Sequence, residues 1–342
     1  MSAPLRFGVL GASRIAPNAL IDPISKIDSA AVTRVAARDR GRAEAFAVEH
    51  NIAEVSNDYR SLIEADDVDV VYNPLPIHLH KEWTIAALRA GKHVLCEKPF
   101  ASNAAEAAEM VAVAQETGLI LGEAFHHWYH PLFQRMLELI REGVIGQVTR
   151  AEGYHSHVIP EIYDGRPDIR WDYSTGGGST MDLGCYSTTW VRHAVQASFP
   201  GEEPTITSAV ATERPENVDA DMTAELAFPS GATGLVESSM IGPERDVRLE
   251  VTGTEGSITV LNPLAPQNGN TLTVRSAHGE SSGQIEAGST YEHMARAFVD
   301  HVLVGAAFFT SGRDSIANMA AIDGMYQAAG LPLRGEGRTD GS

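Results

Sequence analysis

The first 125 residues alternate between short apolar runs and helical patterns, and this alternation constrains the fold more than any other feature. The helical segments 80–91 and 103–118 place apolar residues at helical spacing, and each ends at or just before a glycine. Apolar strands separated by helices are typical of a parallel sheet with helices on both faces. We therefore predict a Rossmann-type, doubly wound α/β domain over residues 1–125. The predicted strands are 6–12, 30–39, 68–76, 93–100 and 119–125.

Beyond residue 125 the pattern changes to strands joined by hairpin signals. Segments 222–240 and 248–261 each place a glycine-containing turn between two alternating runs. Such runs predict an α+β domain over 126–330 with a mainly antiparallel sheet. Helices are predicted at 131–143, 290–302 and 315–330, and the last two are expected to cover the sheet. The polar segment 331–342 is expected to be a flexible C-terminal tail.

Composition excludes several classes of function. Lys and Arg total 26 against 45 Asp and Glu, so the formal net charge of −19 opposes an extended nucleic-acid surface. No segment reaches the roughly 18 consecutive apolar residues of a membrane span, and the N-terminus lacks a signal-peptide pattern. We therefore expect a cytoplasmic protein without nucleic-acid or membrane partners. Cys96 and Cys185, the two cysteines, are too few for a disulfide framework and are expected in the core.

The stretch GVLGASRIA (8–16) stands between the first predicted strand and the first predicted helix. In that position backbone N–H groups and a helix N-terminus can receive a pyrophosphate. As a glycine motif the stretch is weak, since only Gly11 matches cleanly and Ser13 and Ala16 replace the later glycines. Small residues still meet the steric requirement, so we predict a dinucleotide site. The alternative is an ordinary strand-to-helix turn.

The end of the second predicted strand bears on the choice of cofactor. NAD-binding domains present an acid there to the ribose hydroxyls, whereas this chain reads Ala37, Arg38, Asp39. A guanidinium offers a planar set of donors to a 2′-phosphate. We therefore predict a preference for NADP, with NAD possible and with Arg38 as the main phosphate contact. The alternative is that Arg38 is only a solvated strand end.

Four motifs, taken in order, resemble the Gfo/Idh/MocA family of NAD(P)-dependent oxidoreductases, and the resemblance spans nearly the whole chain. These motifs are GVLGASRIA (8–16), YNPLPIHLH (72–80), CEKPF (96–100) and GGGSTMDLGCY (176–186). The tyrosine in the last motif is similar to the subgroup of glucose-fructose oxidoreductase, NADP-dependent xylose dehydrogenase and dimeric dihydrodiol dehydrogenase. The resemblance implies a large open sheet in the second domain, which forms a homodimer or homotetramer interface. It also implies a carbohydrate, polyol or related diol as substrate.

The resemblance implies three catalytic residues: Lys98, Tyr186 and Asp182. A tyrosine is a poor base alone, because its phenol ionises near pH ~10, but a nearby lysine ammonium favours the phenolate. The pair Lys98 and Tyr186 would then accept the hydroxyl proton as hydride leaves the carbon. Asp182 precedes Tyr186 by one helical turn and would accept hydrogen bonds from substrate hydroxyls. The plain alternatives are a solvated Lys98, a core Tyr186 and a helix-capping Asp182.

Further contacts follow from the same motifs. The substrate is expected to meet Asp182, Tyr186, His126 and His155, and no metal site is predicted despite further histidines at 127, 130 and 157. Three positions depart from the family pattern: Ala37 where a serine is common, Ile77 where an asparagine is frequent, and Trp128 where an arginine is frequent. The expected cofactor contacts are Gly11, Ser13, Arg14, Ile15, Arg38, Leu75, Pro76, His80, Glu97, Lys98 and Arg170.

These inferences lead to one function and two alternatives. The predicted function is an NADP-dependent oxidoreductase that moves a hydride between the nicotinamide and a secondary alcohol or hemiacetal carbon of a pyranose, polyol or diol. One alternative is an enzyme that retains its cofactor, for internal redox or a glycosidase-like elimination. The other is a non-catalytic dinucleotide sensor, which would have no need of Lys98 or Tyr186.

Overall fold

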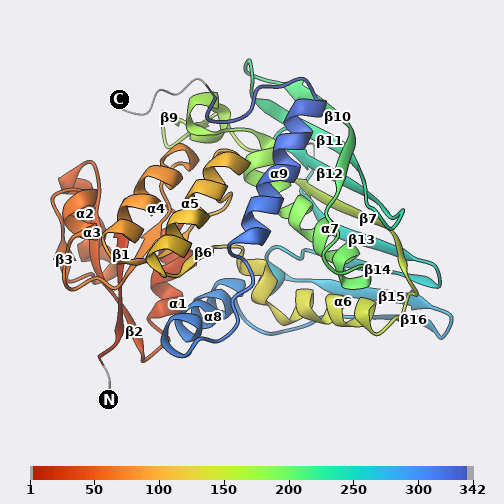
Figure 1. Cartoon of the computed structure of the whole chain (residues 1–342), viewed down its shortest axis with the longest axis horizontal. Coiled ribbons are helices and arrows are strands. Elements are labelled where there is room, and N and C mark those ends of the chain that lie inside the picture. The colour runs from red at the N-terminus through yellow and green to blue at the C-terminus, as the bar shows by residue number, and fades with distance from the viewer. Residues whose placement is uncertain (1–2, 243, 337–342) are drawn as a thin grey trace. The chain divides into compact units, whose positions relative to one another are not determined.

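The computed structural model describes residues 3–242 and 244–336 (Figure 1). The chain divides into two compact units. The first contains residues 1–126 and 291–316, and the second contains residues 127–290 and 317–342. Each unit has its own large sheet, so each is described by itself.

The first unit is built on a six-stranded sheet in the order β3-β2-β1-β4-β5-β6, and every recorded strand pair is parallel. All residues of β4 and β6 are buried, as expected for strands covered on both faces. The strands are β1 (Leu5–Leu10), β2 (Ala30–Ala36), β3 (Glu54–Val55), β4 (Val70–Asn73), β5 (His93–Cys96) and β6 (Leu121–Glu123). The helices are α1 (Asp22–Ile24), α2 (Arg40–His50), α3 (Tyr59–Ile63), α4 (His80–Arg89), α5 (Ala104–Thr117) and α8 (Thr290–Val304). The predicted Rossmann fold is confirmed.

The chain returns to this first unit late, through α8 and the segment that follows it. Phe298 packs against Phe7 of β1 at a ring-centroid distance of 6.2 Å and against Phe308 at 5.3 Å. Gly122 of β6 leaves room for these rings, because a Cβ there would lie 2.6 Å from Phe308 and 3.1 Å from Phe298. The expectation that helix 290–302 covers the antiparallel sheet was wrong, and the expected domain 126–330 loses residues 291–316 to the first unit. The apolar face of this helix can pack on a Rossmann sheet or on an antiparallel sheet. The sequence pattern alone therefore could not tell which sheet the helix covers.

The second unit is built on an eight-stranded sheet in the order β10-β11-β12-β7-β13-β14-β15-β16. Only the pair β12 and β7 is parallel among the pairs of this sheet in the described part of the chain, which confirms the predicted large, mainly antiparallel sheet. The strands are β7 (Val148–Ser156), β10 (Thr205–Glu213), β11 (Asp219–Ala227), β12 (Thr233–Ser239), β13 (Asp246–Gly253), β14 (Gly256–Leu261), β15 (Thr271–Ser276) and β16 (Gly279–Gly283). A separate hairpin pairs β8 (Ile162–Tyr163) with β9 (Arg166–Pro167).

One face of this large sheet packs on helix α7 (Cys185–Ser198). Gly153 of β7 allows the close approach, since a Cβ there would lie 2.8 Å from the Ser187 carbonyl oxygen. Residues on the opposite face of β7 alternate with the buried ones and are half-buried. That face is polar: Arg150 pairs with Glu225 at 3.2 Å, and the Arg248 guanidinium lies 3.7 Å from the centroid of the Tyr154 ring. Helix α6 (Pro131–Arg141) packs beside α7, and α9 (Arg313–Ala328) spans the boundary between the two units in sequence.

The segment after α9 is held in place, which corrects the expected flexible tail for residues 331–336. Arg334 is fully buried, and its guanidinium pairs with Asp219 at 2.7 Å. Tyr173 donates a hydrogen bond of 2.7 Å to the Leu333 carbonyl oxygen. The remainder of the expected tail, 337–342, lies outside the described residues.

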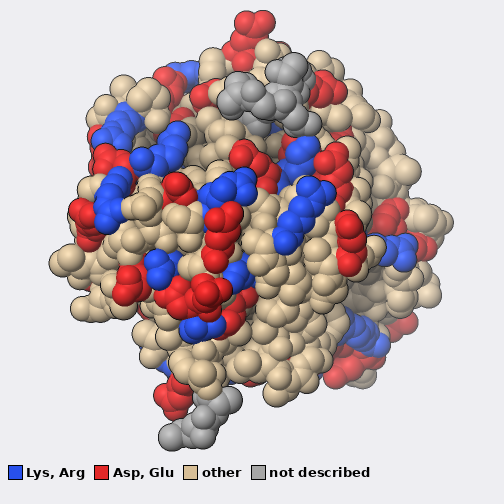
Figure 2. Space-filling model, turned by 60° about the vertical axis from the view of Figure 1, so that its left-hand side comes forward, with Lys and Arg blue, Asp and Glu red and all other residues tan. Residues whose placement is uncertain are grey.

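On the face shown in Figure 2, lysines and arginines lie among aspartates and glutamates. That face therefore offers no broad basic surface for a polyanion to bind. Within the described residues, no helix combines the length and the hydropathy needed to cross a bilayer.

Candidate active site

The turn after β1 has the conformation that a phosphate-binding turn needs. Gly11 adopts a φ of 87°, which a residue with a Cβ rarely takes, and a Cβ there would also lie 3.2 Å from Leu75. Its N–H donates to the Ala36 carbonyl oxygen at 2.6 Å, which ties the turn to the end of β2. Ser13 accepts a hydrogen bond from the Ala16 N–H at 3.3 Å. The helical segment that follows begins with a π-helical turn at Pro17–Ile21 instead of the ordinary α-helix expected there.

Beside this turn, the acid that follows β2 is engaged in capping a helix. The Asp39 carboxylate accepts a hydrogen bond of 3.1 Å from the Arg42 N–H and so caps α2. Arg38 is exposed, and its charge acts on Tyr59, whose pKa is raised by burial and lowered in part by this arginine. The Arg42 guanidinium donates to the Ala12 carbonyl oxygen at 3.3 Å. Arg42, which was not among the predicted site residues, lies in the first turn of α2.

The loop after β4 is organised by two buried polar side chains. Asn73 donates to the His80 carbonyl oxygen at 3.2 Å and accepts from the Leu75 N–H at 3.3 Å. The His80 ring, 1% exposed, places Nε2 at 2.7 Å from the Leu75 oxygen and Nδ1 at 3.0 Å from the Pro99 oxygen. Burial lowers the pKa of His80 to about 4, although both carbonyl oxygens favour the protonated ring. His80 thus links the turn containing Pro76 to the turn containing Lys98, and its predicted cofactor contact stays a prediction.

The turn after β5 presents Lys98 and is braced by a carboxylate. Tyr72 of β4 donates a hydrogen bond of 2.6 Å to Glu97, and the second oxygen of Glu97 accepts from the Lys98 N–H at 3.2 Å. Burial, followed by the charge of Glu97, raises the pKa of Tyr72 well above its ordinary value, so this phenol stays protonated and donates. Lys98 itself is half-buried, and the Lys98–Pro99 peptide is cis. The turn that carries Glu97 and Lys98 is therefore held in place by the hydrogen bonds of Glu97.

His126 lies in the same unit and is 3% exposed. Its ring packs on Tyr291 at a centroid distance of 4.0 Å. Burial, with a further contribution from the Lys98 charge, lowers the pKa of His126 to about 3. The imidazole is therefore neutral at ordinary pH, so it can offer a hydrogen bond to a ligand but not a cationic charge.

In the second unit, Asp182 and Tyr186 lie on two consecutive helical segments. Asp182 belongs to a π-helical turn at Thr180–Gly184, and Tyr186 follows at the start of α7. π-Helical turns are rare and often mark functional sites, and no spacing rule predicts them. The Tyr186 ring, 4% exposed, has His127 at 5.5 Å and His155 at 5.7 Å between ring centroids.

Asp182 is bound by an arginine that is itself held by a second acid. Arg170 donates to Asp182 at 3.3 Å and makes a two-point contact with Asp168 at 2.9 and 2.7 Å. The Asp168 side chain is fully buried, whereas Asp182 keeps 21% of its side chain exposed. Asp168 was missed because nothing in its sequence context distinguishes it from a loop acid. Arg170 was predicted to contact the cofactor, and in this structure its guanidinium orients Asp182.

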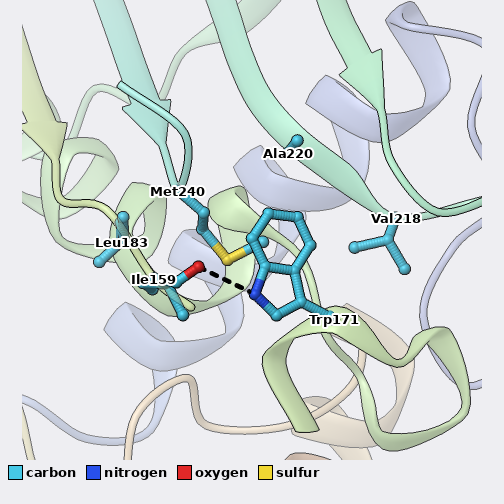
Figure 3. Packing of buried hydrophobic residues seen from close by; sticks show 6 residues of the cluster. All are labelled: Ile159, Trp171, Leu183, Val218, Ala220 and Met240. Carbon is cyan, nitrogen blue, oxygen red and sulfur yellow. Dashed lines mark hydrogen bonds between the residues drawn. The ribbon is translucent and has the colours of Figure 1, made fainter. Parts of the chain in front are cut away.

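A small apolar cluster fixes the two segments that carry Arg170 and Asp182 (Figure 3). Trp171 follows Arg170 directly, and its indole N–H donates to the Ile159 carbonyl oxygen at 3.2 Å. Leu183 follows Asp182 and packs in the same cluster. The contact between Arg170 and Asp182 is therefore flanked by residues that are fixed in this cluster. The members of the cluster are Ile159, Trp171, Leu183, Val218, Ala220 and Met240.

Two of the positions that depart from the family pattern, Trp128 and Ile77, are packed or half-buried. Trp128 packs on His193 at a ring-centroid distance of 4.3 Å and is 7% exposed. Ile77 lies on a short 3₁₀ turn after Pro76 and is half-buried. Within residues 3–242 and 244–336, no three His, Cys, Asp or Glu side chains gather as metal ligands would.

Two protein-family models match the chain in succession. Residues 5–125 match the model described as an oxidoreductase family with an NAD-binding Rossmann fold, and residues 133–259 match the GFO/IDH/MocA C-terminal domain. The chain belongs to the GFO/IDH/MocA oxidoreductase family. As a member of this family it is an oxidoreductase, and its first unit contains the NAD-binding Rossmann domain.

Two similar proteins are named for different carbohydrates. The chain is 33% identical to D-xylose 1-dehydrogenase (NADP(+)) 2 of Haloferax volcanii, over 95% of this chain and 97% of that protein. It is 30% identical to 1,5-anhydro-D-fructose reductase of Ensifer adhaerens, over 95% and 96% of the two chains. Among solved structures, a 3-ketoreductase from Actinomadura kijaniata in complex with NADP and TDP-benzene superposes with a TM-score of 0.84 at 29% identity, over 95% of this chain and 98% of that one.

Proposed function

We propose that this family member is an NADP-dependent oxidoreductase of sugars, polyols or related diols. The observation that carries the proposal is the braced turn at Lys98. It follows β5 at the carboxyl edge of the parallel sheet, the same edge at which the Gly11 turn follows β1. Ligands of open α/β sheets bind at that edge, so a lysine held there is placed for chemistry on a nucleotide-bound substrate.

The Gly11 turn fits a dinucleotide, because it leaves out the Cβ that would fill the approach to the backbone. Bound there, NADP would supply the hydride acceptor or donor. In the proposed mechanism Tyr186 takes the hydroxyl proton during oxidation and returns it during reduction, and the Lys98 ammonium favours the phenolate form. Asp182, oriented by Arg170, accepts a hydrogen bond from a neighbouring substrate hydroxyl.

The preference for NADP is supported by the residues after β2. Asp39 is used as the cap of α2, which leaves the exposed Arg38 as the charged residue before it. An arginine can pair with a 2′-phosphate through two hydrogen bonds. The similar xylose dehydrogenase is named as an NADP(+) enzyme, and the similar 3-ketoreductase was solved in complex with NADP, which supports this preference.

The test of the proposed function is a screen of aldoses, inositols and dihydrodiols with NADP and NAD, read by nicotinamide absorbance. We expect at least one substrate class to give sustained NADPH formation, and a higher kcat/KM with NADP than with NAD. A single turnover without accumulation of NADPH would favour an enzyme that retains its cofactor. No reduction with any class, under conditions where NADP binds, would favour a dinucleotide sensor.

We also propose that the chain forms a homodimer or homotetramer through the face of the eight-stranded sheet opposite α7. The support is a row of half-buried residues on that face of β7. Arg150 and Tyr154 belong to this row and lie on the face opposite α7. Light scattering coupled to size exclusion should give two or four times the 36.7 kDa chain mass. Tyr154→Asp should shift this mass toward the monomer. A monomeric wild-type chain would contradict the proposal.

A further inference from the structure

The second unit contains a fully buried ion pair that the proposed reaction does not use. Arg334, in the segment after α9, donates to Asp219 at 2.7 Å, and neither side chain has any exposed surface. Asp219 is the first residue of β11, 115 positions earlier in the chain. Two charges removed from water in this way are stable only with full hydrogen bonding.

The second oxygen of Asp219 supplies that bonding at the start of the segment that carries the proposed catalytic residues. It accepts from the Thr180 N–H at 2.7 Å, from the Thr180 hydroxyl at 2.6 Å and from the Ser179 hydroxyl at 3.0 Å. Thr180 is the first residue of the π-helical turn that contains Asp182. Asp219 thus holds the beginning of this turn, two residues before Asp182.

Arg334 contacts the residues that precede this π-helical turn. Its Nε donates to the Gly177 carbonyl oxygen at 2.7 Å, and its guanidinium lies 4.0 Å from the centroid of the Tyr326 ring. Tyr326 donates to the Asp219 oxygen that also receives Arg334, at 3.0 Å. Burial, followed by the charge of Asp219, raises the pKa of Tyr326 well above its ordinary value, so this phenol stays a donor.

The glycine-rich turn before the π-helical segment is shaped by this pair. Gly178 has a φ of 137°, and a Cβ there would lie 2.0 Å from Asp219 Oδ1 and 2.8 Å from Arg334 Nη2. Glycine is therefore required at 178 for the ion pair to close against the backbone. The Gly178 carbonyl oxygen in turn accepts from the Asp182 N–H at 3.0 Å.

We propose that Arg334 and Asp219 are positioning residues that set the segment from Gly178 to Tyr186. The inference rests on the proposed function in so far as Asp182 and Tyr186 act on the substrate. It makes the C-terminal segment 331–336 part of the machinery that orients the substrate half of the site. The pair acts through backbone and hydroxyl contacts at 177–180 and does not itself contact a reacting atom.

The test compares Arg334→Met with the wild type in the full-length chain. We expect kcat to fall about ten- to a hundredfold, because a displacement of about 1 Å at reacting groups costs that much. The predicted NADP-binding turn at Gly11 lies in the other unit. The Kd of NADP should therefore stay within about twofold of the wild-type value, well short of a tenfold change. Hydrogen exchange should be faster in a peptide covering 178–186. Unchanged kcat and unchanged exchange in Arg334→Met would overturn the proposal.

Three further chains separate positioning from simple loss of stability. Asp219→Asn combined with Arg334→Met removes both charges, and kcat should recover relative to Arg334→Met alone. Arg192→Met removes another buried arginine, paired with Glu203 at 2.7 Å, and should lower the melting temperature without lowering kcat at 25 °C. A chain ending at Glu336 should behave as wild type. A kcat loss in Arg192→Met equal to that in Arg334→Met would show a general stability effect and contradict the proposal.

If Arg334→Met does not fold, Arg334→Lys decides. It keeps the charge but lacks the planar set of donors that serves Gly177 and Asp219 together, so kcat should still be reduced, whereas a wild-type kcat would overturn the proposal. If the wild-type chain reduces NADP with no substrate class, the proposed function fails. The positioning pair is then judged by exchange in 178–186 alone, where wild-type protection in Arg334→Lys and Arg334→Met would refute it.

Discussion

Replacement of Tyr186 by phenylalanine is expected to lower kcat by about 10²- to 10⁴-fold, the usual contribution of a positioned general acid or base. The change removes one oxygen and keeps the ring, so the packing against His127 and His155 is retained. The measurement is steady-state NADPH formation with the substrate found in the screen, together with the Kd of NADP. Tyr163→Phe, at an exposed tyrosine of the same unit, is the matched control and should keep wild-type kcat.

Lys98→Met belongs to the same experiment, because Lys98 and Tyr186 are proposed to act as one proton-handling unit. Residues that act together show non-additive losses, so the double variant should be about as slow as the slower single variant. Lys26→Met, at an exposed lysine that pairs with Glu292, is the control for removal of a positive charge. Wild-type turnover in both single variants would contradict the mechanism, and fully additive losses would contradict the coupling.

Arg38→Ala is expected to raise the KM for NADP by about 10- to 100-fold, since hydrogen bonds to a charged group contribute roughly 1.5–3 kcal/mol. The KM for NAD should change little, because NAD has no 2′-phosphate. Arg40→Ala is the matched control two residues away, as the Arg40 guanidinium is already engaged with Glu44 at 2.8 Å and with Asn57. An unchanged KM for NADP in Arg38→Ala, or a wild-type preference for NAD, would refute the assignment.

The parts of the fold that the sequence predicts correctly depend on short-range patterns. Apolar runs that alternate with helices specify the parallel sheet, and glycine-containing turns between alternating runs specify the hairpins. The same patterns place Gly11 and Lys98 near the ends of predicted strands 6–12 and 93–100, and in the structure β1 ends at Leu10 and β5 at Cys96, just before them. Both positions follow from where a strand stops, which the next few residues determine.

The contacts that the sequence did not predict join residues far apart in the chain. Arg334 lies in a polar, glycine-bearing stretch, and only the presence of Asp219 in the fold makes it a core residue. The Tyr72–Glu97 hydrogen bond spans two adjacent strands whose order no local pattern specifies. Arg170 was identified, but its partner Asp168 and its role toward Asp182 depend on the apolar cluster around Trp171.

The late return of the chain to the Rossmann unit has a consequence for synthesis on the ribosome. Strand β6 is the last strand of its sheet, and Thr310 covers its edge: the Glu123 N–H donates to the Thr310 carbonyl oxygen at 2.7 Å, and the Thr310 hydroxyl donates back at 2.7 Å. During translation that edge exists for nearly 190 residues before its cover emerges, a time of about 10–40 s at 5–20 residues per second. An open strand edge can form hydrogen bonds with strands of other chains. A nascent chain of this protein therefore exposes an aggregation-prone edge until shortly before its last helix is made.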